Sequence, residues 1–265
     1  MNYNKKREKV YMIKRFKRPF IIIFSIILVF IIIFISTVEI EASRANSSIE
    51  EFINRGELIC TEGSTEYYLV RKEYDYENTD LRIVDTYNDG LVGTTGDIYF
   101  TDTDFGSNFV TKYICKKLRV GHCAVVASPN AEFNYEIVGN VNKKDNIVKI
   151  YENDWQYLVN FHEYIAVRVK GMDADKQNKL ILQLQKMEGS PYNFFVFAHM
   201  KNRYYCTDMA TYAYKEAFDM NINKFFVSTG ASMISNDNTY LIYYKREVNK
   251  GDIKYQVYFL GEWYD

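Results

Sequence analysis

The stretch RYYCTDMATYAY, residues 203–214, decides which fold and which chemistry this 265-residue chain is expected to have. It places Cys206 between two tyrosines and the start of a predicted helix that runs to about Phe218. One apolar stripe of that helix is formed by Met209, Ala210, Ala213 and Ala217. Cys206 lies at the N-terminal end of the stripe, where free backbone N–H groups and the helix dipole favour a thiolate. Cys206 is therefore either a reactive nucleophile or a small buried side chain.

A histidine partner would favour the reactive interpretation. The chain has three histidines, and His122 stands at the start of the apolar segment GHCAVVA. A polar ring at the start of a buried strand costs free energy unless it has a bonding partner. If this strand meets the helix of Cys206, imidazole and thiol form the pair that activates a nucleophile. His162 and His199 lack such a setting, so we expect them to be solvated or bonded for structural reasons.

The N-terminal region predicts a membrane anchor. Residues 19–38, PFIIIFSIILVFIIIFISTV, carry no charge and are long enough to cross a bilayer. The preceding residues are rich in Lys and Arg, which indicates a cytoplasmic N-terminus and an exported body. A cleaved signal peptide, giving a secreted protein, is the alternative. The predicted divisions are a basic cytoplasmic tail (1–18), a transmembrane signal-anchor (19–40), a polar juxtamembrane spacer with one short helix (41–56) and an extracytoplasmic domain (57–265).

Composition limits the partners. The formal net charge of -1 gives no indication of nucleic-acid binding. The four cysteines form no CxxC pair and no Cys/His spacing typical of zinc, so we expect no metal and no cofactor. In an exported body disulfides are allowed. A Cys60–Cys115 bridge and four unpaired buried thiols both remain open.

The order of elements predicts an α+β domain built on an antiparallel sheet packed on helices. Residues 57–87 give only weak strand signals. Further strands are predicted over residues 96–102, 122–128, 134–139, 146–151 and 163–170. Helices are predicted over residues 173–189 and 206–218, and two C-terminal strands are joined by a turn at residues 249–252.

Five segments in order, GDIYFT, RVGHCAVV, YEIVG, EGSPYNFF and RYYCTDMATYAYKEAF, resemble the circularly permuted NlpC/P60 group of papain-like hydrolases, the YiiX/YebB-like branch. The resemblance covers residues 96–235, about half of the chain. It implies a papain-like α+β fold with Cys206 as nucleophile and His122 as general base.

The resemblance also implies a third polar residue that orients the imidazole. It assigns Glu136 of YEIVG to this role, with Asn140 as the alternative. The two residues would share a face of an extended strand about 13 Å apart, so only one can contact the ring. By the same resemblance Asp97 is structural, and Tyr205 supplies either a hydroxyl or a packed wall.

The implied function is that of a membrane-anchored cysteine hydrolase acting on amides, with cell-wall peptides as the substrate by analogy. One alternative is a papain-like acyltransferase or lipid ester hydrolase. Another is a non-catalytic anchored domain that binds polymers through its 24 tyrosines.

Overall fold

The computed structural model describes residues 2–84, 90–102, 109–139, 146–155, 162–195 and 200–262, with side chains from Ile21 onward. The chain divides into two compact units, Met1–Ile40 and Glu41–Asp265.

The first unit consists of the N-terminal part of α1 (Asn2–Asn54). From Ile21 to Ile33 its side chains are exposed almost without interruption, which leaves an apolar surface that water does not favour. By length and composition this helix can cross a membrane, a property that N-terminal signal sequences share. The direction of crossing stays a prediction.

The C-terminal part of α1 belongs to the second unit. Its buried side chains are Ala42, Ala45, Ile49 and Phe52, which recur at three- and four-residue spacing and form one apolar face. Where the sequence suggested a polar spacer with one short helix, the chain remains helical to Asn54 and this face joins the core.

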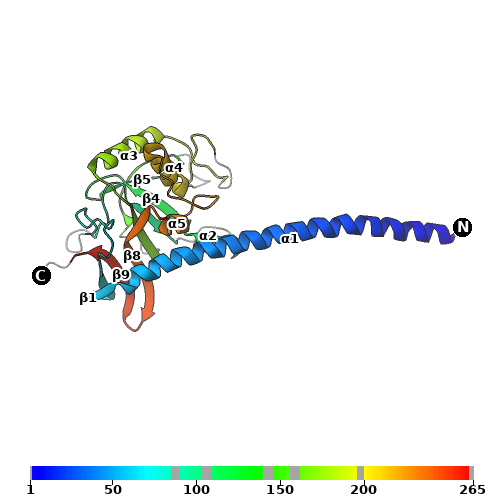
Figure 1. Ribbon diagram of the computed structural model, residues 1–265, viewed down its shortest axis with the longest axis horizontal. Helices are drawn as coiled ribbons and strands as arrows, with labels where there is room; N and C mark the ends of the chain where they lie inside the picture. Colours follow the sequence, from blue (N-terminus) through cyan, green and yellow to red (C-terminus); the bar gives the residue numbers. More distant parts are fainter. Residues whose placement is uncertain are drawn as a thin grey trace. The chain divides into compact units, whose positions relative to one another are not determined.

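A nine-stranded sheet forms the centre of the second unit, in the order β1-β2-β9-β8-β7-β3-β4-β5-β6 (Figure 1). The strands are β1 (Gly56–Glu62), β2 (Thr65–Arg71), β3 (Ile98–Thr101), β4 (His122–Val126), β5 (Phe133–Glu136), β6 (Lys149–Glu152), β7 (Glu163–Val169), β8 (Thr239–Lys250) and β9 (Ile253–Gly261). Neighbouring strands are antiparallel, as expected, except that β2 and β9 run parallel. The expectation of a purely antiparallel sheet is wrong at that pair.

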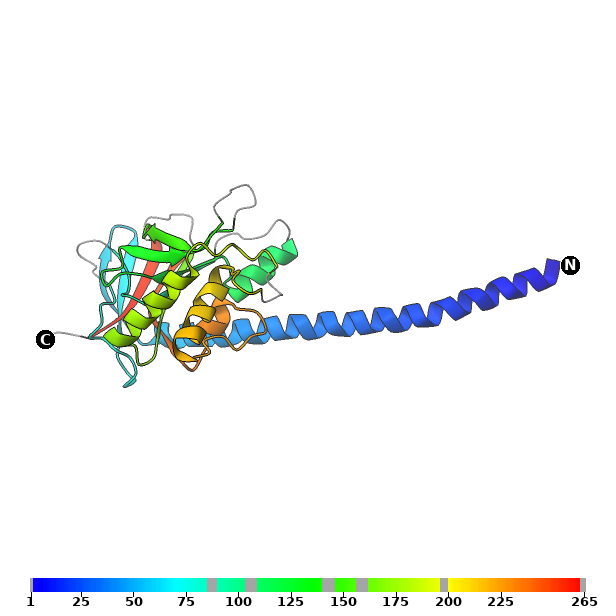
Figure 2. The ribbon, with the colours of Figure 1, turned by 90° about the horizontal axis from the view of Figure 1, so that it is seen from above.

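The remaining helices are α2 (Phe109–Leu118), α3 (Ala174–Met187), α4 (Cys206–Phe218) and α5 (Gly230–Ile234). Helix α3 buries Leu180, Leu184 and Met187, the side chains that its spacing predicted to be apolar partners. Helices α3 and α4 lie side by side, and α4 packs against β4 (Figures 1 and 2). The α+β class is therefore confirmed. The five-residue α5 was not predicted, because it is too short to show a period.

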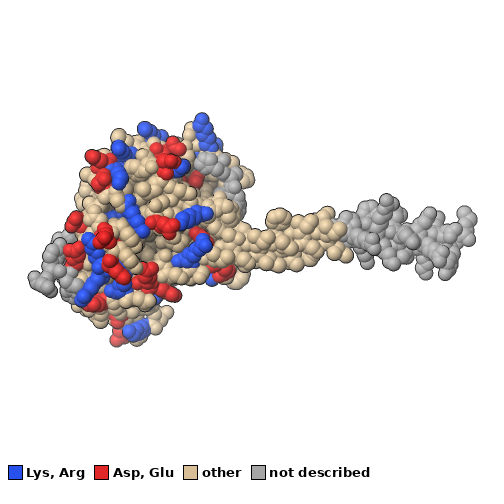
Figure 3. Space-filling model, viewed as in Figure 1, with Lys and Arg blue, Asp and Glu red and all other residues tan. Residues whose placement is uncertain are grey.

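A buried ion pair fixes the start of β3. The Arg168 guanidinium donates to both carboxylate oxygens of Asp97, at 2.8 and 2.7 Å. Asp97 also accepts the N–H of Thr94 at 2.7 Å, which closes the turn before the strand. Burial raises the pKa of Asp97, and the charge of Arg168 opposes that rise. Asp97 thus has the structural surroundings that the resemblance implied. On the visible face of the body, Lys and Arg are interspersed with Asp and Glu (Figure 3).

Candidate active site

His122 and Glu136 come together because their strands pair. Strands β4 and β5 are antiparallel, with Ala124 opposite Glu136. Since side chains alternate along a strand, His122 projects from the same face as Ala124 and Glu136. The His122 Nε2 and Glu136 Oε2 atoms lie 2.7 Å apart. The His122 side chain is 20% exposed and that of Glu136 is 8% exposed, so the pair lies largely out of solvent.

Two further side chains hold the Glu136 carboxylate. The indole N–H of Trp155 donates to Oε1 at 2.7 Å, and Asn134 approaches the same oxygen at 3.5 Å. The Trp155 ring also stacks on the His122 imidazole, with centroids 5.4 Å apart and planes inclined by 19°. The carboxylate and the imidazole are therefore fixed by the same tryptophan.

Cys206 lies close to the same imidazole, near enough for its side chain to influence the charge of the ring. Because Nε2 faces Glu136, Nδ1 is the ring nitrogen left for the sulfur. Burial lowers the pKa of His122, but hydrogen bonds with Cys206 and Glu136 and the charges of both outweigh burial and raise the pKa to about 10. The surroundings favour an imidazolium next to Cys206.

The start of α4 is anchored by the loop before α5. Tyr205 is the N-cap residue, and its side chain makes no capping bond, so the first N–H groups of the helix lack a side-chain cap. Its hydroxyl instead accepts the N–H of Ser228 at 2.7 Å, and the Thr207 hydroxyl donates to the Ser228 carbonyl at 2.7 Å. Tyr205 is both a buried wall and a bonded hydroxyl.

The charge of Cys206 acts on two other thiols and on a tyrosine. Burial raises the pKa of Cys115 and of Cys123, and the nearby charge of Cys206 adds to both shifts. Burial, with a contribution from Cys206, also raises the pKa of Tyr192. All four cysteines are free, Cys60 is exposed and only Cys123 and Cys206 are buried, which matches neither disulfide bonding nor four buried thiols.

The three residues expected from the sequence, Cys206, His122 and Glu136, thus lie in one cluster. His162 is exposed and forms an ion pair with Glu247, as expected of a histidine bonded for structural reasons. His199 and the alternative residue Asn140 lie outside the described residues.

Sequence reasoning missed Trp155 and Asn134. Asn134 could have been found, because it precedes Glu136 by two residues and so shares its strand face. Trp155 follows the last residues of β6 without a periodic pattern, and only the fold brings its indole to Glu136.

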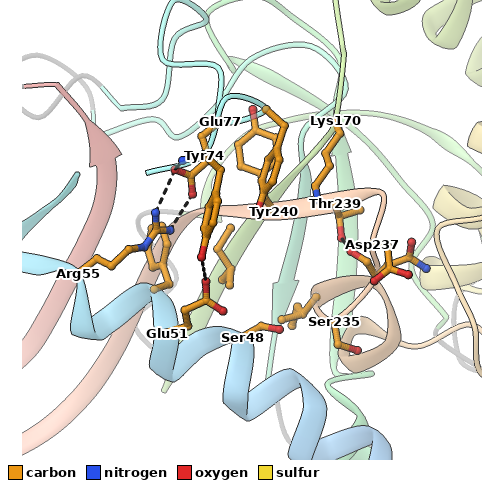
Figure 4. A pocket seen from close by; sticks show the side chains of 15 residues that line it. Ser48, Glu51, Arg55, Tyr74, Glu77, Lys170, Ser235, Asp237, Thr239 and Tyr240 are labelled. Carbon is orange, nitrogen blue, oxygen red and sulfur yellow. Dashed lines mark hydrogen bonds and ion pairs between the residues drawn. The ribbon is translucent and has the colours of Figure 1, made fainter. Parts of the chain in front are cut away.

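A hollow of about 180 Å³ lies between the end of α1 and the start of β8 (Figure 4). Several of its polar groups are bonded to one another. Arg55 binds Glu77 through two hydrogen bonds of 3.0 and 2.7 Å, and the Tyr74 hydroxyl donates to Glu51 at 2.8 Å. These contacts attach the end of α1 to the loop after β2, and they account for the geometry of this region without a ligand.

Among the residues that the structure describes, no group of three His, Cys, Asp or Glu side chains is arranged to hold a metal ion. No family model matches the chain, and no curated protein matches it. Among solved structures, the chain is similar to YiiX of Escherichia coli O157:H7, which is described as a metalloprotein. The likeness has 19% sequence identity and a TM-score of 0.44, and covers 56% of this chain and 96% of YiiX. It is partial, and it shows neither a circular permutation nor an activity.

Proposed function

We propose that this protein is a membrane-anchored cysteine hydrolase that cleaves amides by thiolate attack. The observation that carries the proposal is the position of His122, which contacts Glu136 through Nε2 and lies close to Cys206. A base between a nucleophile and an orienting carboxylate is the arrangement of hydrolytic triads.

In the proposed reaction His122 holds the proton of the Cys206 thiol, and the thiolate attacks the amide carbonyl carbon. The C–N bond then breaks, His122 delivers its proton to the departing amine, and a thioester remains on Cys206. His122 next takes a proton from water, which attacks the thioester and releases the acid and the thiol. Glu136 stays ionised and holds the imidazole through Nε2.

The start of α4 supplies a group for the charge that develops on the carbonyl oxygen. The backbone N–H of Cys206 belongs to the first turn, whose N–H groups have no acceptor within the helix. Such an N–H, with the helix dipole behind it, can donate to an oxyanion.

The proposed fold is the papain-like one of the permuted NlpC/P60 group, and the proposed location is outside the membrane that holds α1. The N-terminal charges support this orientation by the positive-inside rule. Peptide amides of a cell wall are the proposed substrate, by analogy with that group.

A lipid ester hydrolase or acyltransferase is the second candidate, and one feature favours it. Tyr192, whose pKa is raised in part by the charge of Cys206, packs on Phe194 with ring centroids 4.8 Å apart. Phe194 is 51% exposed and Phe195 is 70% exposed. Exposed aromatic side chains close to the nucleophile offer an apolar surface to an acyl chain.

The deciding experiment incubates the full-length protein, in detergent, with purified wall fragments and with lipid esters. We expect one of the two substrates to be cleaved, with loss of on the order of 10³-fold or more of the activity in Cys206→Ala. Cys60→Ala is the matched control, because Cys60 is exposed and lies on β1. Equal activity of Cys206→Ala and Cys60→Ala, or turnover of neither substrate, would leave a non-catalytic binding domain as the better description.

A further inference from the structure

A hollow of about 460 Å³, separate from the Cys206 cluster, opens beside the C-terminal end of α2. It is lined by the end of α2, the start of β7, the middle of β8 and two residues of α1, Ala42 and Asn46. Its volume is that of an ordinary ligand site. No step of the proposed hydrolysis uses it.

The acidic groups of this hollow are already bonded. Glu163 accepts from Arg119 at 3.0 Å, and Glu247 pairs with His162. Asp102 accepts the backbone N–H of Glu163 at 2.9 Å. Glu163 and Glu247 are thus each paired with one cation of the lining, while the charge of Asp102 acts on both His162 and Lys116.

Two cations of the lining, Arg246 and Lys116, form no direct ion pair with a carboxylate among the described residues. The Arg246 guanidinium donates to a neutral acceptor, Oε1 of Gln256, at 3.0 and 2.7 Å, and lies over the Tyr258 ring, 5.8 Å from its centroid. Lys116, exposed on the last turn of α2, forms no ion pair with a residue that the structure describes. Both cations line the hollow, so it offers positive charge to an anion.

Helix α2 itself has the composition of a helix that lies at a membrane surface. Its sequence, FVTKYICKKL, contains three lysines and no acid. Phe109 is 84% exposed, Val110 61% and Tyr113 43%. Exposed apolar side chains next to lysines on a short helix are typical of binding in the interface of a bilayer with anionic lipids.

Chain connectivity keeps the hollow near the membrane. Ala42 follows Val38, the last residue of the apolar run, by four residues. Even a fully extended chain of that length spans only about 14 Å. A lining residue of the hollow is thus held within reach of the headgroups of the bilayer that α1 enters.

We propose that α2 and the hollow beside it bind an anionic phospholipid of the bilayer that holds α1, with the headgroup phosphate received by Lys116 and Arg246. The apolar side chains of Phe109 and Val110 then lie among the acyl chains. The contact is independent of Cys206 chemistry, and it holds the body against the membrane surface by a second attachment.

The test measures hydrogen–deuterium exchange of residues 109–118 in the full-length protein reconstituted in nanodiscs. Three conditions are compared: phosphatidylcholine, phosphatidylcholine with phosphatidylglycerol, and phosphatidylcholine with soluble glycerol phosphate. We expect slower exchange only with phosphatidylglycerol, by roughly fivefold for each lysine engaged. Equal exchange with both lipids would overturn the proposal, and so would equal protection by soluble glycerol phosphate, which would indicate a free-phosphate site.

Lys116→Glu should remove most of the protection. Lys179→Glu is the matched control, since Lys179 is an exposed lysine on α3 outside the lining of the hollow. Equal losses in the two variants would mean that overall charge, and not this site, is responsible. Hydrogen–deuterium exchange of β7 should stay unchanged in both variants. Arg246→Gln tests the other cation of the pair by the same measurement.

Discussion

His122 Nε2 lies 2.7 Å from Glu136 Oε2, so the imidazole is held by a carboxylate on the neighbouring strand. This contact fixes which ring nitrogen faces Cys206 and adds negative charge beside the ring. Replacing Glu136 by Gln keeps the size of the side chain and removes the charge. We expect the reactivity of Cys206 toward an alkylating reagent at neutral pH to fall by about 100-fold. Glu132→Gln, an exposed carboxylate on the preceding loop, should leave the rate unchanged. Similar rates in Glu136→Gln and the native protein would remove Glu136 from the proposed machinery.

The pH dependence of the alkylation rate should distinguish Cys206 from an ordinary thiol. Slight burial and the charge of Glu62 raise the pKa of Cys60, so its thiolate fraction falls about tenfold for each pH unit below neutrality. Cys206, beside a protonated His122, should lose much less reactivity between pH 7 and about pH 5. Peptide mapping after brief alkylation gives both rates in one sample. Parallel decline of the two cysteines would show that Cys206 is not activated.

The stability of the body should depend on pH through His122. Its pKa in the folded protein is raised from 6.5 to about 10, against the lowering effect of burial. Because the folded pKa lies above the unfolded value, the stabilisation is complete below pH 6.5 and is lost as the pH rises through about 10. Urea unfolding of the native protein and of His122→Gln at several pH values measures this stabilisation. The difference in unfolding free energy between the native protein and His122→Gln should shrink as the pH rises from 6.5 to about 10. A constant difference would contradict a raised pKa of His122.

Trp155 has two roles that one substitution separates. Trp155→Phe keeps an aromatic ring against His122 and removes the N–H that donates to Glu136 at 2.7 Å. Hydrogen bonds to charged groups contribute about 1.5–3 kcal/mol, so the carboxylate should become less well held. We expect a roughly tenfold slower alkylation of Cys206 with little change in stability at alkaline pH. The same rate as in the native protein would show that stacking alone positions the imidazole.

The buried pair Asp97–Arg168 should matter for stability and not for chemistry. Both side chains are almost fully buried, at 2% and 1% exposure. Removing one charge therefore leaves the other buried without a partner. Asp97→Asn should destabilise the body by about 3–5 kcal/mol in urea unfolding. Asp219→Asn removes an exposed ion pair with Lys215 and should change the unfolding free energy very little. Comparable effects of the two substitutions would contradict the assigned burial.

The sequence revealed the parts of the site that depend on local pattern. A cysteine at a helix start and a histidine at the start of an apolar strand are visible without a structure, and so is Glu136 once the resemblance is considered. The apolar period also located β4, β7, α3 and α4 within a few residues.

The rest depends on contacts between distant residues. Trp155 reaches Glu136 across the sheet, and Cys115 comes near Cys206 from a different helix. Strands β1 and β2 gave weak signals because β1 is largely exposed and β2 is only partly buried, so neither shows a clear alternation. No period in a single segment could have shown that β2 pairs with β9.

The parallel pairing of β2 with β9 has a consequence for biogenesis. Residues Thr65–Arg71 lie against Tyr255–Gly261, so the hairpin at the beginning of the body has no sheet to join until nearly the last residues of the chain have emerged. Such long-range closure makes folding slow, and it makes synthesis of the chain as far as Gly261 a precondition for a completed sheet. A ribosome-stalled or prematurely ended chain would expose the unpaired edge of β2 to proteases and to other unfinished copies.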